Sequence, residues 1–115
     1  MKQRFEIPYK PDSTNTHWRR GNNVTYLNKK GKEFRDNVQQ FIKLQKYKTF
    51  KGKIKVKIEL CFKSKRERDI DNYFKAILDS FNGFLYEDDK LIYKLSSSKK
   101  LGCDRDYFII EVEEL

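Results

Sequence analysis

The segment "KIKVKIELCF", residues 53–62, is the clearest indication of the fold in this chain. Apolar residues alternate in it with mostly charged ones, which is the period of a β-strand with one buried face. The apolar side comprises Ile54, Val56, Ile58, Leu60 and Phe62, and the other side comprises Lys53, Lys55, Lys57, Glu59 and Cys61. We therefore predict a sheet that is covered on one face and leaves a mostly basic face in solvent.

Two helices are predicted to cover that sheet. Between residues 29 and 47, the apolar side chains of Phe34, Val38, Phe41 and Ile42 fall on one helical face. In "DNYFKAILDSFNG", residues 71–83, apolar residues recur at positions 74, 77, 78 and 81. The final Asn-Gly pair is typical of a helix end.

Three further strands complete the predicted sheet. "RFEIPY", residues 4–9, alternates as a strand does, and Pro8 favours an edge position. Residues 10–26 are rich in turn formers and indicate a long functional loop or a loose hairpin. The last two strands, within residues 90–101 and 105–114, are expected to form a hairpin that turns near Gly102.

These elements predict one domain, residues 1–115, of the α/β (α+β) class. We expect a small mixed or antiparallel sheet of about four strands, with two helices packed on one face.

The composition indicates a polyanionic partner. The net charge of +9 favours nucleic acid first and an anionic membrane surface second. Because the sequence has no long apolar run and no signal-peptide pattern, we expect a cytoplasmic protein with no membrane partner. Cys61 and Cys103 are far apart and outside any CxxC motif, so we expect two reduced thiols rather than a disulfide or a zinc site.

Acidic residues gather in "RERDIDNYFKAILDSFNGFLYEDDK", residues 66–90, although the chain is basic. Asp69 and Asp71 precede the second helix, and residues two apart on an extended chain share a side. Asp88 and Asp89 follow that helix, where the returning chain is expected to bring a third carboxylate close. Oxygen ligands suit Mg²⁺ or Mn²⁺, and a bound cation would relieve the mutual repulsion of the three carboxylates.

Simpler explanations account for each acid separately. Asp69 or Asp71 is explained equally well as a helix N-cap, which is worth about 1 kcal/mol. The segment "EDD", residues 87–89, is explained equally well as a polar turn. Lys75 lies one turn after Asp71. It is explained either as an ion-pair partner of Asp71, worth about 0.3 kcal/mol, or as a cation that faces a scissile phosphate. We expect Asp79 to be structural or a partner of Lys75. The spacing by itself leaves both readings open.

Two basic groups are candidates for DNA binding. Arg66 and Arg68 lead directly into Asp69, where Arg68 is well placed to hold a phosphate beside a metal. The nearby Lys63 and Lys65 are explained as well by a solvated run of charge. The second group comprises Arg19, Arg20, Lys29 and Lys30, together with Trp18, which either stacks on unpaired bases or anchors the core.

The segment "RDIDNYFKAILDSFNG" followed by "YEDDKLI" resembles the signature of the RusA family of Holliday junction resolvases. The matching positions are Arg68, Asp69, Asp71, Asn72, Lys75, Asp79, Asp88 and Asp89. Asn15 and the segment "FRDNV", residues 34–38, also match, so the resemblance extends over nearly the whole chain.

The resemblance implies a small homodimeric, Mg²⁺-dependent endonuclease. Such an enzyme binds four-way DNA junctions and nicks two strands of like polarity symmetrically, without an organic cofactor. It implies that Asp69, Asp71 and Asp89 are catalytic metal ligands, with Asp88 as the alternative to Asp89. It also implies catalytic or phosphate-contacting roles for Lys75 and Arg68, with Asn72, Asp79 and Asp88 around the ligands. Two alternatives stay open: a non-catalytic nucleic-acid-binding module of the same fold, and a nuclease that acts on flaps or other branches.

Overall fold

The computed structural model describes residues 1–13, 18–21, 24–27 and 29–115, and for residues 18–21 and 24–27 it describes the backbone alone. The strands are β1 (Lys2–Ile7), β2 (Trp18–Gly21), β3 (Val24–Leu27), β4 (Ile54–Cys61), β5 (Ile92–Lys100) and β6 (Tyr107–Glu114). The helices are α2 (Lys29–Lys43) and α3 (Phe74–Phe81), and the short 3-10 turns are η1 (Ile70–Tyr73) and η2 (Asp89–Leu91).

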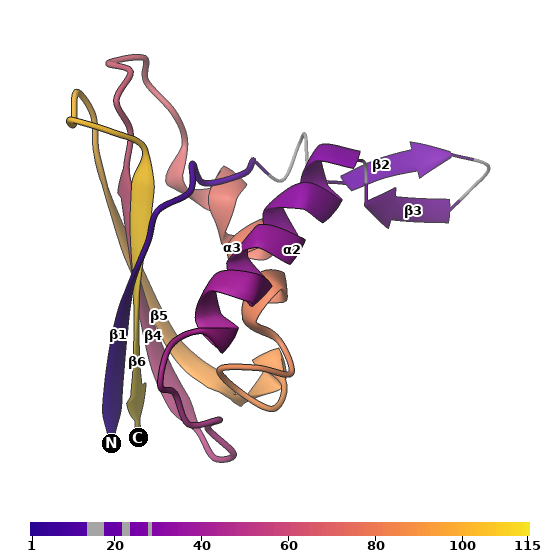
Figure 1. Ribbon diagram of the computed structural model, residues 1–115, viewed down its shortest axis with the longest axis vertical. Coiled ribbons are helices and arrows are strands. Elements are labelled where there is room, and N and C mark those ends of the chain that lie inside the picture. The colour runs from indigo at the N-terminus through magenta and orange to yellow at the C-terminus, as the bar shows by residue number, and fades with distance from the viewer. Residues whose placement is uncertain (14–17, 22–23, 28) are drawn as a thin grey trace.

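A four-stranded mixed sheet organises the fold, as predicted. Its strand order is β1-β6-β4-β5, in which β4 is parallel to β5 and antiparallel to β6. Strand β1 lies at one edge, as Pro8 indicated. Helices α2 and α3 lie together on one side of the sheet, and the β2–β3 hairpin extends away from it (Figure 1). This pairing confirms the hairpin predicted within residues 10–26, whereas residues 14–17, 22 and 23 of that range lie outside the described part of the chain.

The predicted hairpin between the last two strands is wrong, because β4 lies between β5 and β6. The chain leaves β4, passes through α3 and returns as β5 parallel to β4, and parallel neighbours need such a crossover. Gly102, with a φ of 71°, does lie in a turn. That turn crosses the end of β4, where the Cys103 amide donates to the Phe62 carbonyl at 2.9 Å. It therefore connects strands on opposite sides of β4.

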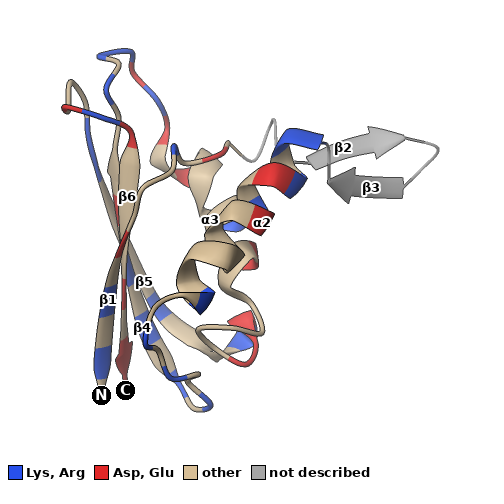
Figure 2. Ribbon diagram, in the orientation of Figure 1, with Lys and Arg blue, Asp and Glu red and all other residues tan. Residues whose placement is uncertain are grey.

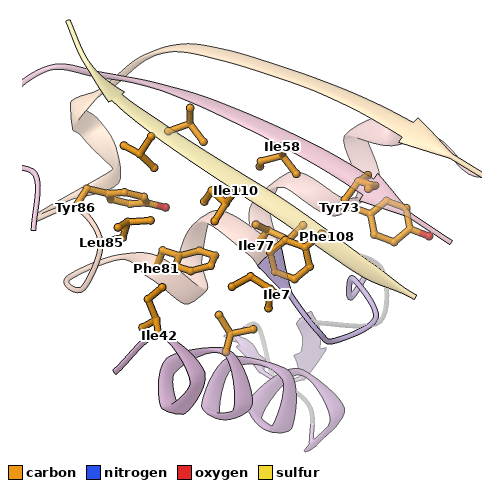
Figure 3. Packing of buried hydrophobic residues seen from close by; sticks show 14 of the residues in the cluster. Ile7, Ile42, Ile58, Tyr73, Ile77, Phe81, Leu85, Tyr86, Phe108 and Ile110 are labelled. Atoms are coloured by element: carbon orange, nitrogen blue, oxygen red, sulfur yellow. The ribbon is translucent and has the colours of Figure 1, made fainter. Parts of the chain in front are cut away.

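The core lies between the sheet and the two helices (Figure 3). The alternation in β4 is confirmed, since its Ile and Val side chains and Leu60 are buried while Lys55 and Lys57 are exposed. The Phe81 ring of α3 meets the Phe108 ring of β6 edge to face, with centroids 6.4 Å apart. Cys61 departs from the pattern, because it is buried although it belongs to the outer face.

Both helices differ from the prediction at one end. Helix α2 ends at Lys43 rather than near Tyr47, where Leu44 and Gln45 donate to carbonyls three residues back. The second helix begins with the 3-10 turn η1 and becomes α-helical at Phe74. It ends at the predicted Asn-Gly pair, where Gly83 has a φ of 81° that few other residues adopt.

Two other expectations concern the thiols and membranes. Cys61 and Cys103 are both free, as predicted. None of the helices in the described part of the chain has the length and apolar character that crossing a bilayer requires.

The packing predicts that Ile58→Ala destabilises the protein by about 2–5 kcal/mol, because it leaves a cavity beneath the inner strand β4. Chemical denaturation followed by circular dichroism measures the free energy of unfolding. Lys55→Ala, on the exposed face of the same strand, is the control and should change it by less than about 0.5 kcal/mol. Equal losses in the two variants would contradict a one-sided core.

Candidate active site

The loop between β4 and η1, residues 62–69 (the β4–α3 loop), carries the first predicted acid. Asp69 occupies the N-cap position of η1 with φ −86° and ψ 128°, but its side chain makes no capping hydrogen bond. The extended backbone ends there, because Ile70 already belongs to the turn. The alternation from which we expected Asp69 and Asp71 to share a side therefore does not reach Asp71.

An open groove of about 440 Å³ lies along the β4–α3 loop. Its lining residues are Ser13, Arg66, Glu67, Arg68, Asp69, Asn72 and Tyr73. The groove thus brings together both arginines that were predicted to bind DNA, one predicted metal ligand and Asn72. Asp71 is exposed and does not belong to this lining.

Arg68 is held in place from two directions. Its guanidinium carbon lies 4.3 Å from the centroid of the Phe62 ring, and its Nη1 donates to the Arg66 carbonyl at 3.2 Å. An arginine has five N–H donors, so these contacts orient the group and leave donors for a phosphate. The loop as a whole carries charges of both signs (Figure 2).

A second group of charges forms where α3 ends and the chain returns. Lys75 Nζ lies 3.5 Å from Asp79 Oδ2, which confirms the expected pairing of Asp79 with Lys75. The Tyr86 hydroxyl donates to the Leu78 carbonyl and ties the returning chain to α3. Burial raises the pKa of Tyr86 well above its ordinary value, and the charges of Asp89 and Asp79 raise it further. Tyr86 therefore lies under the influence of both carboxylates.

Asp88 and Asp89 have opposite environments although they are neighbours. Asp88 accepts a hydrogen bond from the Lys90 amide at 2.9 Å, and this bond lowers the pKa of Asp88. Burial raises the pKa of Asp89, and the neighbouring Asp88 and the charge of Asp79 add to that effect, whereas Lys75 opposes it. The polar-turn explanation thus suits Asp88, while Asp89 belongs electrostatically with Asp79 and Lys75.

The expected convergence of three carboxylates is not seen. Among the described residues, no group of three or more His, Cys, Asp or Glu side chains is close enough to hold a metal ion. Asp71 lies in the turn η1 that precedes α3, and Asp79 lies in the last turn of α3, so the two carboxylates belong to opposite ends of this helical segment. The donor chemistry still fits a hard cation, because carboxylate oxygens are the available ligands and Asp89 experiences like-charge repulsion that a cation relieves. Asp69, Asp71 and Asp89 stay predictions as metal ligands.

The structure describes only part of the second basic group that was predicted to bind DNA. Lys29 and Lys30 are exposed at the start of α2. Asn15 lies outside the described residues, and the side chains of Trp18, Arg19 and Arg20 are not described. Their predicted DNA contacts stay predictions.

Two residues at the site were not predicted from the sequence. Tyr86 was missed because its partner is a backbone carbonyl, which leaves no trace in the residue pattern. Lys99 on β5 donates to Glu67 of the β4–α3 loop at 3.1 Å. Lys99 was missed because its position opposite the buried Leu60 follows from the pairing of β5 with β4, whereas the sequence analysis paired β5 with β6.

Comparison with known proteins identifies the family. The model of the family described as "Endodeoxyribonuclease RusA" matches residues 8–113. This chain belongs to the RusA family. The crossover junction endodeoxyribonuclease rusA of Enterobacteria phage HK97 is 38% identical over 89 residues, covering 75% of this chain and 73% of the relative. The RusA proteins of Escherichia coli strain K12 and of Enterobacteria phage 82 are 31% identical over 85 residues, covering 71% of each chain.

RusA membership confirms the resemblance drawn from the central motif, and with it the assignment of this chain as a nuclease. It also implies dependence on a divalent metal in general terms.

The charges of Asp79 and Lys75 near Asp89 predict opposite effects of two substitutions on the pKa of Asp89. Asp79→Asn should lower it, because a repelling carboxylate is removed, and Lys75→Met should raise it, because a stabilising cation is removed. Carboxyl-carbon NMR titration of the metal-free protein measures the value directly. Lys57→Met, on the outer face of the sheet, is the control and should leave it unchanged. Shifts of the same sign in the two variants would refute this arrangement.

Proposed function

We propose that this chain resolves four-way DNA junctions by paired, symmetrical nicks in strands of like polarity, with Mg²⁺ as its metal and Mn²⁺ as the substitute. The observation that carries the proposal is the groove in which Arg66 and Arg68 lie beside Asp69, in a chain that belongs to the RusA family. An acid in a phosphate-binding groove weakens DNA binding unless a cation lies between the two negative charges. The relatives are named as crossover junction endonucleases, which supports a branched substrate.

The predicted ligands of the metal are Asp69, Asp71 and Asp89, with Asp88 as the alternative to Asp89. When bound, a divalent cation supplies activation of water and stabilisation of negative charge on the phosphoryl oxygens. The capping bond that Asp88 accepts from Lys90 favours Asp89 as the ligand, because it already occupies an oxygen of Asp88.

The basic side chains have separate tasks in this proposal. Arg68 binds a phosphate through the donors that its contacts with Phe62 and Arg66 leave unused. Lys75 is 60% exposed and its pairing with Asp79 is a surface ion pair of small energy, so its ammonium remains able to approach a scissile phosphate. The DNA contact extends beyond the groove to the second basic group and its neighbours, which are Lys29, Lys30, Arg19, Arg20, Asn15 and Trp18.

A homodimer is part of the proposal. A four-way junction has approximate two-fold symmetry, and a two-fold dimer would offer two equivalent sites to two equivalent phosphates. A protomer of 14.0 kDa is small beside four duplex arms, so a second protomer also enlarges the contact. Recognition would depend on branch shape and backbone rather than on base sequence.

Cleavage assays on three substrates test the proposed function. With Mg²⁺ present, we expect paired nicks at symmetrical positions in a four-way junction and no cleavage of a linear duplex of the same sequence. Comparable cleavage of a flap would indicate a nuclease with another branch preference. Binding without any cleavage would indicate a non-catalytic module and overturn the proposal.

Asp71→Asn should reduce junction cleavage more than about 100-fold, because a predicted metal ligand is lost. Junction binding should be unchanged or tighter, because the substitution removes a negative charge that repels DNA. Gel-shift and cleavage assays measure the two effects on the same preparation. Asp104→Asn, an exposed acid in the turn after β5, makes the same charge change and should leave cleavage intact. A folded Asp71→Asn variant that no longer binds junctions would contradict the assigned role.

A further inference from the structure

We propose that Lys99 is a positioning residue, which holds the β4–α3 loop so that Arg68 and Asp69 keep the arrangement that strand cleavage needs. This inference rests on the proposed function for its effect on cleavage. Its effect on the loop itself does not depend on that function.

The register of the sheet explains how a lysine from β5 reaches this loop. Lys99 is the partner of Leu60 in the parallel pairing of β5 with β4, and Leu60 is buried against the core. Paired residues on neighbouring strands face the same side, so Lys99 points to the side of the sheet that carries the helices. Its side chain is 28% exposed, whereas the next residue, Lys100, is exposed and belongs to the opposite face.

The ammonium group of Lys99 has two acceptors, both on the β4–α3 loop. Its Nζ lies 3.1 Å from Glu67 Oε2 and 2.5 Å from the backbone carbonyl oxygen of Arg68. A half-buried ammonium is costly unless it is hydrogen-bonded, so these two acceptors account for its position. The carbonyl contact matters most here, because it fixes the main chain directly before Asp69.

The contacts of Lys99 complement the others that shape the loop. At the start of the loop, the Lys63 amide donates to Asp106 Oδ1 at 2.8 Å, and the Arg66 amide donates to Ser64 Oγ at 3.1 Å. Lys99 holds the opposite end, next to η1. Positional errors of about 1 Å in a catalytic group can reduce a rate by 10²-fold, so a loose loop would slow cleavage more than it weakens binding.

The pairing also explains Glu67, an acid among the basic residues of a phosphate-binding groove. Glu67 is 83% exposed, and its ion pair with Lys99 is therefore a weak tether by itself. Glu67→Gln should change the cleavage rate by less than about threefold, because the contact of Lys99 with the Arg68 carbonyl remains.

A matched pair of substitutions tests the inference. Lys99→Met and Lys100→Met each remove one positive charge from adjacent positions of β5, but only the first removes the two loop contacts. In Lys99→Met we expect the turnover rate for junction cleavage to fall about tenfold or more, with the dissociation constant changed by less than about threefold. Lys100→Met should retain the wild-type rate, and Lys99→Arg should recover most of it.

Two further readouts separate positioning from other roles. Amide hydrogen exchange should be faster in residues 63–69 of Lys99→Met and unchanged in β4, which also shows that the variant is folded. The slope of log binding constant against log salt should be unchanged, whereas loss of a phosphate contact would reduce it by about 0.9. A reduced slope, or a loop that exchanges as slowly as in the wild type, would overturn the inference. If the loop loosens in Lys99→Met while the wild-type protein cleaves no junction, positioning stands and the proposed function fails.

Discussion

Burial of the apolar face of β4 is the constraint on which the rest of the structure depends. The apolar side chains of β4 are buried in the same core as Ile77 and Phe81 of α3, and this packing decides where the helix lies relative to the sheet. Because α3 connects two parallel neighbours, its two ends are joined to opposite ends of the strands. The β4–α3 loop and the η2 turn are therefore placed by the core, although most of their own side chains are exposed.

The electrostatic organisation follows from the same arrangement. The end of α3 and the returning chain bring Asp79 and Asp89 close enough to one buried tyrosine, Tyr86, for their charges to raise its pKa. Lys75, from the same helix, partly compensates these acids. Acidic residues gather at this place although the chain as a whole has a net charge of +9. A site that gathers like charges within a basic protein is typical of function rather than of stability.

The elements that could be predicted from the sequence are those with a strong local signal. Three features each rest on the residues of one segment. They are the alternation in β4, the edge position of β1 before Pro8 and the end of α3 just before Gly83. The pairing of β5 and β6 could not be predicted in this way, because sequence neighbours do not reveal that β4 separates them. At the site, the pairing of Lys75 with Asp79 followed from helical spacing. The placement of Asp71 did not, because it depends on a single turn, η1, that interrupts the extended backbone.

The pairing of β1 with β6 has a consequence for how the protein is made. The ladder joins Lys2 to Glu113 and Ile7 to Phe108, so almost the whole chain separates the two strands. Strand β1 is synthesised before β6, and contacts so distant in sequence form slowly. Until β6 arrives, the edge of β4 that it will occupy presents unpaired amides between apolar side chains, a combination that promotes aggregation.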